Sequence, residues 1–177
     1  MKFEQELLVF RRRYDDLSSN DYSSLFRLVT DIVATVLKKS RAGIMLGLLE
    51  LGYDRGRFVG GFHKVGTNEI YLNKSALRVM KGESPDDFYK AYLFHLLLHE
   101  YIHATGVYNE SKTRQLTRSI SLAMFDTRHP VGRLVVQGLN ALFPYGFHED
   151  RYVPSPEDVY NPEYILLRHR DSELTYI

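Results

Sequence analysis

The sequence has no cysteine and no tryptophan, and only six prolines among its 177 residues. Without cysteine, disulfide scaffolds, thiolate nucleophiles and cysteine-ligated zinc fingers are excluded. This composition fits a reducing compartment, and we expect a cytoplasmic protein. No stretch of apolar residues approaches the roughly 18 that a membrane span needs. The first six residues lack the basic and then apolar order of a signal peptide, so neither a membrane segment nor a secretory leader is expected.

An excess of charge of one sign is also lacking. Lysine and arginine total 23 against 22 acidic residues, a formal net charge of +1. A protein that binds nucleic acid non-specifically usually carries a marked basic excess, so no nucleic-acid partner is expected. The 44% hydrophobic and 25% charged content fits one globular domain over residues 1–177. We place its core at 41–142 and a C-terminal wrap at 143–177.

The first 70 residues contain two expected helices and one ambiguous segment. Residues 3–16 have the pattern of an amphipathic helix, and apolar residues recur at helical spacing from Asp21 to about Lys39. The apolar run at 43–49 fits either a buried strand or a helix, because short apolar runs fit both. Glycines at 52, 56, 60, 61 and 66 then predict a loop. Residues 67–73 alternate as a strand does.

The clearest helix of the sequence begins near Ser84 and ends before Gly106. Ser84 can cap it, and Pro85 suits its first position. Apolar side chains cover nearly its whole circumference, which is typical of a central, buried helix. Further helices are expected at 110–125 and from Pro130 to about 142. The last 34 residues hold four of the six prolines and several aromatics, which indicates an ordered but irregular wrap with a short extended piece at 173–177.

The central helix carries polar residues that its buried position does not explain. His99 and His103 are four residues apart and therefore lie on one helix face, where two imidazoles can reach one zinc ion at roughly 2.0–2.1 Å. Glu100 follows the first histidine, close enough to approach a water on the metal without ligating it. The pattern is that of zinc peptidases, in which the glutamate is the general base. We expect His95, one turn earlier, to be a core residue or a neighbour of the ligands.

At this point the sequence resembles the zincin metalloprotease superfamily. The resemblance implies an α+β, zincin-like single domain, helix-rich with a small mixed sheet, that hydrolyses peptide or protein substrates with Zn²⁺. In the metzincin branch a glycine turn leads to a third histidine. Gly106 matches that glycine, but Asn109 occupies the ligand position, and a neutral amide is a poor zinc ligand.

The gluzincin branch takes its third ligand from a glutamate on the following helix, and Glu110 stands at such a position. The short spacing from His103 resembles compact, one-domain, archaeal-type proteins of this branch. The resemblance therefore implies a zinc site of His99, His103 and Glu110, with Asn109 as the less favoured ligand, and Glu100 as the catalytic base.

The resemblance also implies a substrate-binding edge strand before the central helix. Residues 68–73 match it, so Asn68, Glu69, Tyr71 and Asn73 are expected to contact the peptide. Chemistry alone offers four candidates to stabilise the oxyanion: Tyr108, His129, His148 and Tyr152.

Two other functions remain open at this stage. The spacing of His99, His103, Gly106 and Asn109 resembles a bacterial family of metal-dependent endoribonucleases. Glu100 stands where that family has glycine, and Asn109 stands where it has its last histidine. The chain could also be a zinc-binding protein without catalysis, or a latent protease whose C-terminal tail covers the cleft. Truncation near Tyr145 would test latency.

Overall fold

The computed structural model describes residues 2–54, 57–141 and 151–167 as an α+β fold. The helices are α1 (Lys2–Asp16), α2 (Tyr22–Leu37), α3 (Lys74–Glu83), α4 (Asp86–Ala104), α5 (Glu110–Met124), α6 (Pro130–Gln137), η1 (Gly138–Ala141) and α7 (Pro156–Tyr160). The strands are β1 (Met45–Leu49), β2 (Tyr53–Asp54), β3 (Gly61–His63), β4 (Glu69–Asn73), β5 (Arg151–Tyr152) and β6 (Glu163–Ile165). Among these residues no helix combines the length and the apolar content that a membrane crossing requires.

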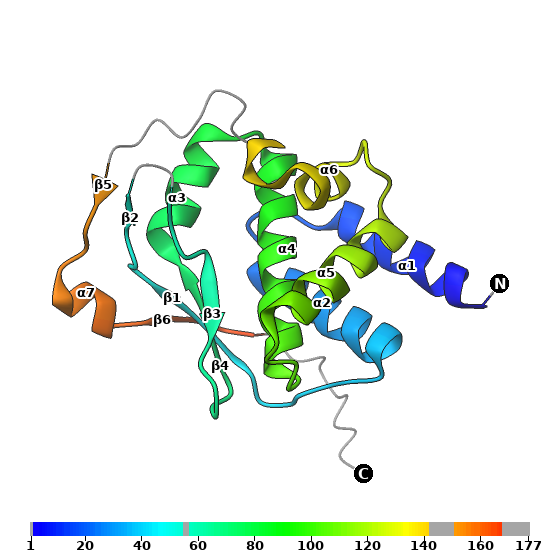
Figure 1. Cartoon of the computed structure of the whole chain (residues 1–177), viewed down its shortest axis with the longest axis horizontal. Coiled ribbons are helices and arrows are strands. Elements are labelled where there is room, and N and C mark those ends of the chain that lie inside the picture. The colour runs from blue at the N-terminus through cyan, green and yellow to red at the C-terminus, as the bar shows by residue number, and fades with distance from the viewer. Residues whose placement is uncertain (1, 55–56, 142–150, 168–177) are drawn as a thin grey trace, which may run out of the picture.

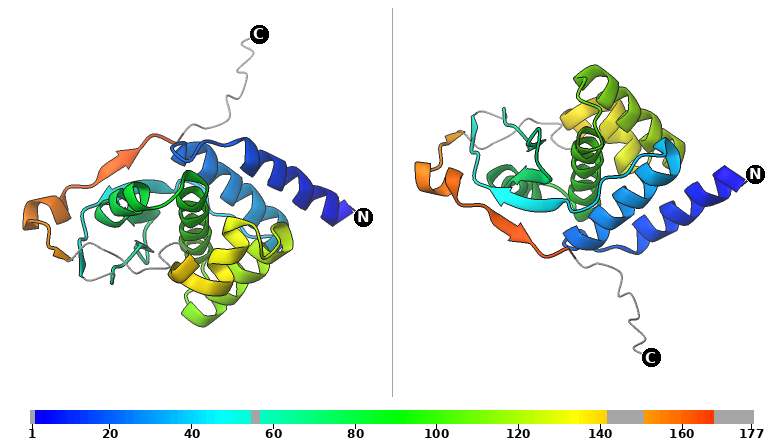
Figure 2. Two further views of the ribbon diagram at one scale, coloured as in Figure 1. Left: turned by 90° about the horizontal axis from the view of Figure 1, so that it is seen from above. Right: turned by 90° about the horizontal axis from the view of Figure 1, so that it is seen from below.

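Helix α4 lies at the centre of the molecule, as its apolar circumference predicts. The sheet and α3 lie on one side of it, and α1, α2, α5 and α6 lie on the other (Figures 1 and 2). Leu93, Phe94 and Leu97 are fully buried, in contact with apolar side chains from several elements. A helix that is covered on all sides is a fixed platform, and the polar side chains on it are held accordingly.

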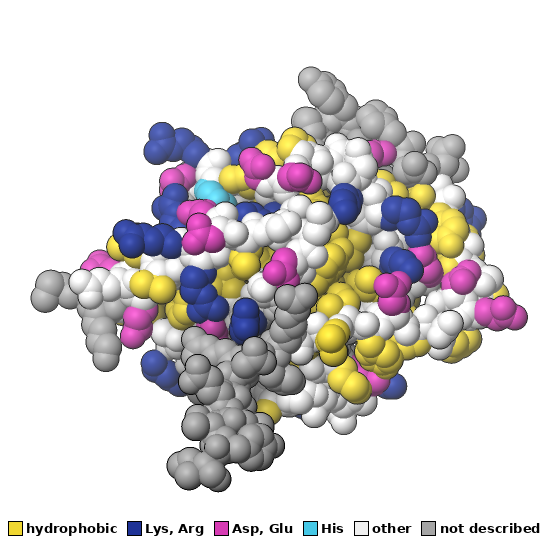
Figure 3. All heavy atoms as spheres, turned by 180° about the vertical axis from the view of Figure 1, so that it is seen from behind, with side chains coloured by type: hydrophobic (Ala, Val, Ile, Leu, Met, Phe, Trp, Pro, Cys, Tyr) yellow, Lys and Arg dark blue, Asp and Glu magenta, His cyan; other side chains and the backbone are white. Residues whose placement is uncertain are grey.

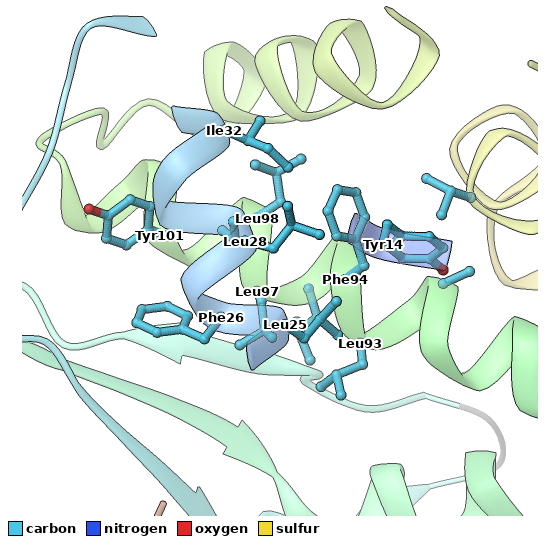
Figure 4. Packing of buried hydrophobic residues seen from close by; sticks show 14 of the residues in the cluster. Tyr14, Leu25, Phe26, Leu28, Ile32, Leu93, Phe94, Leu97, Leu98 and Tyr101 are labelled. Atoms are coloured by element: carbon cyan, nitrogen blue, oxygen red, sulfur yellow. The ribbon is translucent and has the colours of Figure 1, made fainter. Parts of the chain in front are cut away.

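Helix α2 supplies the largest facing surface for α4. Leu25, Leu28 and Ile32 project from one face of α2 toward α4, and Tyr14 of α1 meets Phe94 edge-on at 5.3 Å between ring centroids (Figure 4). The side chain of Asp21 caps α2 by accepting a hydrogen bond from the Ser24 amide. The core therefore extends beyond the predicted 41–142, because the N-terminal helices contribute to it.

The main sheet has the strand order β3-β4-β1-β6. β1 and β4 are parallel, whereas β3 and β6 each pair antiparallel with their neighbour. The ambiguous run 43–49 is thus a strand. Gly47 is required in it, because a Cβ at this position would lie 2.8 Å from the Tyr71 ring of the paired strand.

The prediction that residues 68–73 form an edge strand is wrong. They do form strand β4, but β3 pairs with one side of it and β1 with the other. The segment expected to be a loop folds back as β3, through a turn in which Gly66 adopts φ +84°. The exposed edge on this side of the sheet therefore belongs to β3.

The described part of the C-terminal wrap adds to both sheets. β5 pairs antiparallel with β2, and β6 pairs antiparallel with β1 at the sheet edge opposite β3. Between them Ser155 and Asp158 form a capping box at the start of α7. The wrap is thus more regular than predicted. The extended piece expected at 173–177 lies outside the described residues.

Candidate metal centre

Three potential ligands converge at the end of α4. The Oε2 of Glu110 lies 3.4 Å from His99 Nε2 and 3.1 Å from His103 Nε2. Two ligand atoms each about 2.0–2.1 Å from zinc at the tetrahedral angle lie roughly 3.3–3.4 Å apart, by geometry from usual zinc bond lengths. Glu110 is therefore spaced from each histidine as neighbouring ligands of a tetrahedral zinc would be, and the three ligand atoms lie within 4.8 Å of one another, so that they could hold a metal ion.

The chain reaches this arrangement by a sharp turn between two helices. α4 ends at Ala104, Gly106 adopts φ +94°, and α5 begins at Glu110. The side chain of Asn109 caps α5 by accepting the amide hydrogen of Lys112 at 2.8 Å. The turn thus brings Glu110 to the histidines, while the side chain of Asn109, the alternative ligand, is engaged elsewhere.

The hydrogen bonds of His103 leave one nitrogen available for a metal. Its Nδ1 lies 2.7 Å from the carbonyl oxygen of Val107. A carbonyl only accepts, so Nδ1 donates to it, and Nε2 is the nitrogen that faces Glu110 and the candidate metal position. Thr113 donates to the same carbonyl at 2.9 Å and lies 3.4 Å from Nδ1. A buried hydroxyl of α5 therefore helps to orient this imidazole.

The Glu110 carboxylate is held in a similar way. Arg114, one turn later on α5, donates from Nε to Oε1 at 2.6 Å, which leaves Oε2 directed at the histidines. Partial burial alone would raise the pKa of Glu110, but the hydrogen bonds from Arg114 and His103 outweigh it and lower the pKa. Burial lowers the pKa of His99, an effect that Glu110 only partly offsets. An ionised carboxylate beside a neutral imidazole is the protonation state of metal ligands.

Glu100 lies next to this group in a different environment. Its side chain is 5% exposed, and its carboxylate accepts the backbone amide hydrogen of His63 at 2.9 Å. Burial raises the pKa of Glu100 to about 7, although His103 and the His63 amide act against the increase. A carboxyl group with such a pKa can both accept and return a proton near neutral pH.

A cleft of about 870 Å³ opens in front of the metal centre. Its walls come from β3, α4, α5 and α6, and it contains all four residues of the centre. Tyr108 is the one of the four oxyanion candidates that lines it. Lining side chains that the sequence did not single out are His63, Arg114, Arg118, Leu134 and Leu139.

The four residues predicted to bind substrate are not part of the cleft lining. Asn68 accepts a hydrogen bond from Arg41 at 2.8 Å, and the Tyr71 hydroxyl donates to Glu69 at 2.8 Å. Asn73 is fully buried and donates to the carbonyls of Gly52 and Val59. These side chains stabilise the sheet and its loops, and substrate contacts at them stay a prediction.

The remaining oxyanion candidates lie elsewhere. His129 stacks on Phe125 at 4.3 Å and accepts the Val131 amide hydrogen as the cap of α6. Tyr152 belongs to β5 and packs against Tyr53. His148 lies outside the described residues.

Two further histidines line the cleft. The sequence did not single out His63, and it predicted His95 to be a core residue or a neighbour of the ligands. His63 stands on β3, in a segment that its glycines predicted to be a loop. His95 lines the cleft one turn before His99, and burial lowers its pKa to about 4. Helical spacing could have indicated Arg114 and Arg118, which follow Glu110 at intervals of four residues on α5. No sequence signal marks His63, because its position depends on strand pairing.

Comparison with protein-family models, with curated proteins and with solved structures gave no significant match to this chain. The chain is an α+β protein with a His99–His103–Glu110 group that could hold a metal ion.

Proposed function

We propose that the protein is a zinc-dependent metallopeptidase of the zincin type, related in plan to compact gluzincins. The observation that carries the proposal is the convergence of His99, His103 and Glu110, with Glu100 buried beside them at the floor of an open cleft. Two neutral imidazoles and one carboxylate form the donor set of catalytic zinc in proteins, which leaves one position open. The hydrogen bond between His103 Nδ1 and the Val107 carbonyl, which orients Nε2 toward Glu110, supports metal binding rather than a purely structural cluster.

The chain's own residues would carry the proton transfers. Bound zinc would polarise a substrate carbonyl and acidify a water molecule. Glu100 accepts the proton of that water and then donates it to the leaving amine. Its burial favours this role, because a carboxylate in contact with bulk water is a weaker base. Among the candidates within the described residues, Tyr108, exposed at the cleft wall, is the one that could stabilise the oxyanion.

The exposed edge of β3 offers a place for the peptide. The Asn73 amide donates to the Gly60 carbonyl, and the Lys64 amide donates to the Glu69 carbonyl. Because pairing alternates along an antiparallel ladder, the backbone groups of Gly61 and His63 are directed away from β4. The His63 amide already donates to Glu100, so an extended peptide could add to β3 through the backbone groups of Gly61 and the carbonyl of His63.

The experiment compares the wild type with Glu100→Gln, both purified without chelators and loaded with one equivalent of zinc. We expect the wild type to cleave an unfolded protein and to leave structured RNA intact. The variant should keep its zinc and lose about 10²–10⁴-fold in rate, the usual contribution of general base catalysis.

Three results would contradict the proposal. Loss of zinc in the variant would make Glu100 a ligand. Cleavage of RNA would favour the endoribonuclease alternative, although the engagement of Asn109 as a helix cap does not favour it. Zinc binding without any hydrolysis by the wild type would leave a non-catalytic metal protein.

A further inference from the structure

The charge balance of the cleft indicates what kind of substrate it accepts. Apart from histidines, the acidic and basic side chains among the described lining residues are two glutamates and two arginines: Glu100, Glu110, Arg114 and Arg118. A divalent cation would neutralise both carboxylates and leave the two guanidinium groups uncompensated. The loaded cleft is then positive, although the whole chain is nearly neutral. On the face opposite the view of Figure 1, by contrast, acidic and basic side chains are interspersed (Figure 3).

Arg118 is the cation in this cleft that lacks a carboxylate. Arg114 is paired with Glu110. The Nη1 of Arg118 donates to the carbonyl oxygen of Val135 on α6, and no carboxylate within the described ranges forms an ion pair with it. A guanidinium has five N–H donors, so others remain to bind an anion. The contact with Val135 fixes the group at the α5–α6 wall.

The direction of the cleft relates Arg118 to the reacting centre. Gly60, before β3, lies against Tyr92 and Leu96 of α4, whereas His63 at the end of β3 contacts Glu100. β3 and α4 therefore run in the same direction, toward the metal centre. A peptide that pairs antiparallel with β3, the more stable pairing per residue, extends its C-terminal part away from the metal and toward Gly60.

The rise of α5 and the rise of an extended peptide together indicate which peptide residue faces Arg118. Arg118 follows Glu110 by eight residues, or about 12 Å at a helical rise of 1.5 Å. Its side chain leans back toward the start of α5, as helical side chains do. An extended peptide advances by about 3.3 Å per residue. The guanidinium therefore faces roughly the second or third residue after the scissile bond. The cleft lining also contains the apolar side chains of Leu96, Leu134 and Leu139.

We propose that the cleft selects peptides that carry a carboxylate two or three residues beyond the scissile bond, with Arg118 as its binding partner. This inference rests on the proposed peptidase function. The carboxylate can belong to an aspartate or glutamate side chain or to the free C-terminus of a short peptide, because a guanidinium pairs with both in the same way.

The test uses the zinc-loaded full chain and three peptides of one sequence. The first has glutamate at the third position after the scissile bond and an amidated end. The second has glutamine there and an amidated end. The third has glutamine at the second position and a free carboxylate on a shortened chain. We expect kcat/KM to be about tenfold higher for the first, the third or both than for the second, as suits one partly exposed charge-assisted hydrogen bond.

Variants of Arg118 test whether this side chain causes the preference for carboxylate peptides. Arg118→Met should abolish it, and Arg118→Lys should retain part of it, because lysine keeps the charge but loses the planar fork. The matched control is Arg12→Met, an exposed arginine on α1 outside the cleft lining, which should leave the preference unchanged. Equal kcat/KM for all three peptides in the wild type would overturn the inference and leave the peptidase proposal intact.

If no peptide is cleaved, measurements of peptide binding test the anion site separately from the peptidase function. Fluorescence anisotropy of the labelled peptides on zinc-loaded Glu100→Gln protein measures recognition without hydrolysis. Tighter binding of the carboxylate peptides that disappears in Glu100→Gln/Arg118→Met would support the anion site while the peptidase function fails. Equal binding of all three peptides, or Arg118-dependent cleavage of RNA, would overturn the inference.

Discussion

The Nδ1 atom of His103 lies 2.7 Å from the carbonyl oxygen of Val107, within the turn that links the two helices of the metal centre. This contact orients the ring and directs Nε2 toward Glu110. It also couples the ligand to the turn that delivers Glu110. Hydrogen bonds of this kind tune the metal affinity of a site without contact to the metal itself.

We predict that Thr113→Val weakens zinc binding by about tenfold, at the lower end of the effect of such supporting contacts. The substitution removes the hydroxyl that donates to Val107 and approaches His103 Nδ1. Competition with a chromophoric chelator measures the zinc dissociation constant. Thr117→Val is the matched control, since Thr117 is equally buried on α5 and donates only to the Thr113 carbonyl. Similar affinities in the two variants would contradict a supporting role for Thr113.

The second prediction concerns the third ligand. Glu110→Ala should lower zinc affinity by more than about 100-fold, beyond the range seen when only an outer hydrogen bond is lost. Asn109→Ala should retain the affinity and destabilise α5 by about 1 kcal/mol through the lost cap. Glu157→Ala, an exposed glutamate in the first turn of α7, is the control for loss of a helix-dipole charge. Zinc retention in Glu110→Ala would place the third ligand elsewhere.

The third prediction is a pH dependence of stability that arises at His129. Burial lowers the pKa of this histidine below its ordinary 6.5, with the nearby Asp15 acting against the shift. The unfolded chain therefore binds the proton more readily, and the free energy of unfolding should decrease as pH falls from about 6.5 toward the lower pKa of the folded state. Protonation also removes the Nδ1 acceptor that caps α6.

His129→Asn should retain a capping acceptor but lose this titration. Urea denaturation of the metal-free protein at a series of pH values measures both effects. We expect the slope of stability against pH to differ most just below pH 6.5, where the variant should be flatter. Identical slopes for the two proteins would refute the assignment to His129.

The fourth prediction concerns Arg41, which joins the end of α4 to the sheet. Its Nη1 donates to the Ala104 carbonyl at 3.0 Å, and its Nε donates to Asn68 at 2.8 Å. Arg41→Met should lower the free energy of unfolding by about 1–3 kcal/mol, the usual range for hydrogen bonds from a charged group. Lys39→Met, on the same connection, is the control. A loss of less than about 0.5 kcal/mol, comparable to a surface substitution, would contradict the clamp.

Some features of this fold follow from neighbouring residues in the sequence, and others depend on contacts between distant residues. The sequence predicted α4 with its buried circumference, because helical periodicity is local. The expected cap was wrong: Ser84 ends α3, where its hydroxyl donates to the Met80 carbonyl, and Pro85 precedes the first residue of α4. The sequence also placed His99, Glu100 and His103 together, since residues one and four apart on one helix have a fixed geometry. Ligand chemistry favoured Glu110 over Asn109, but whether its side chain reaches the histidines depends on how Gly106 turns the chain.

Only the tertiary structure decided which strand forms the edge beside the metal centre. The residues of β4 alternate well, but alternation does not show which neighbour covers each side of a strand. The short β3, with its glycines, has no pattern of its own, and β6 pairs with β1 from more than 100 residues away. Arg118 reaches the cleft for a similar reason, since α6 must pack beside α5 to form its wall. Local periodicity thus determined the helix that carries the ligands, whereas long-range pairing and packing determined the cleft around them.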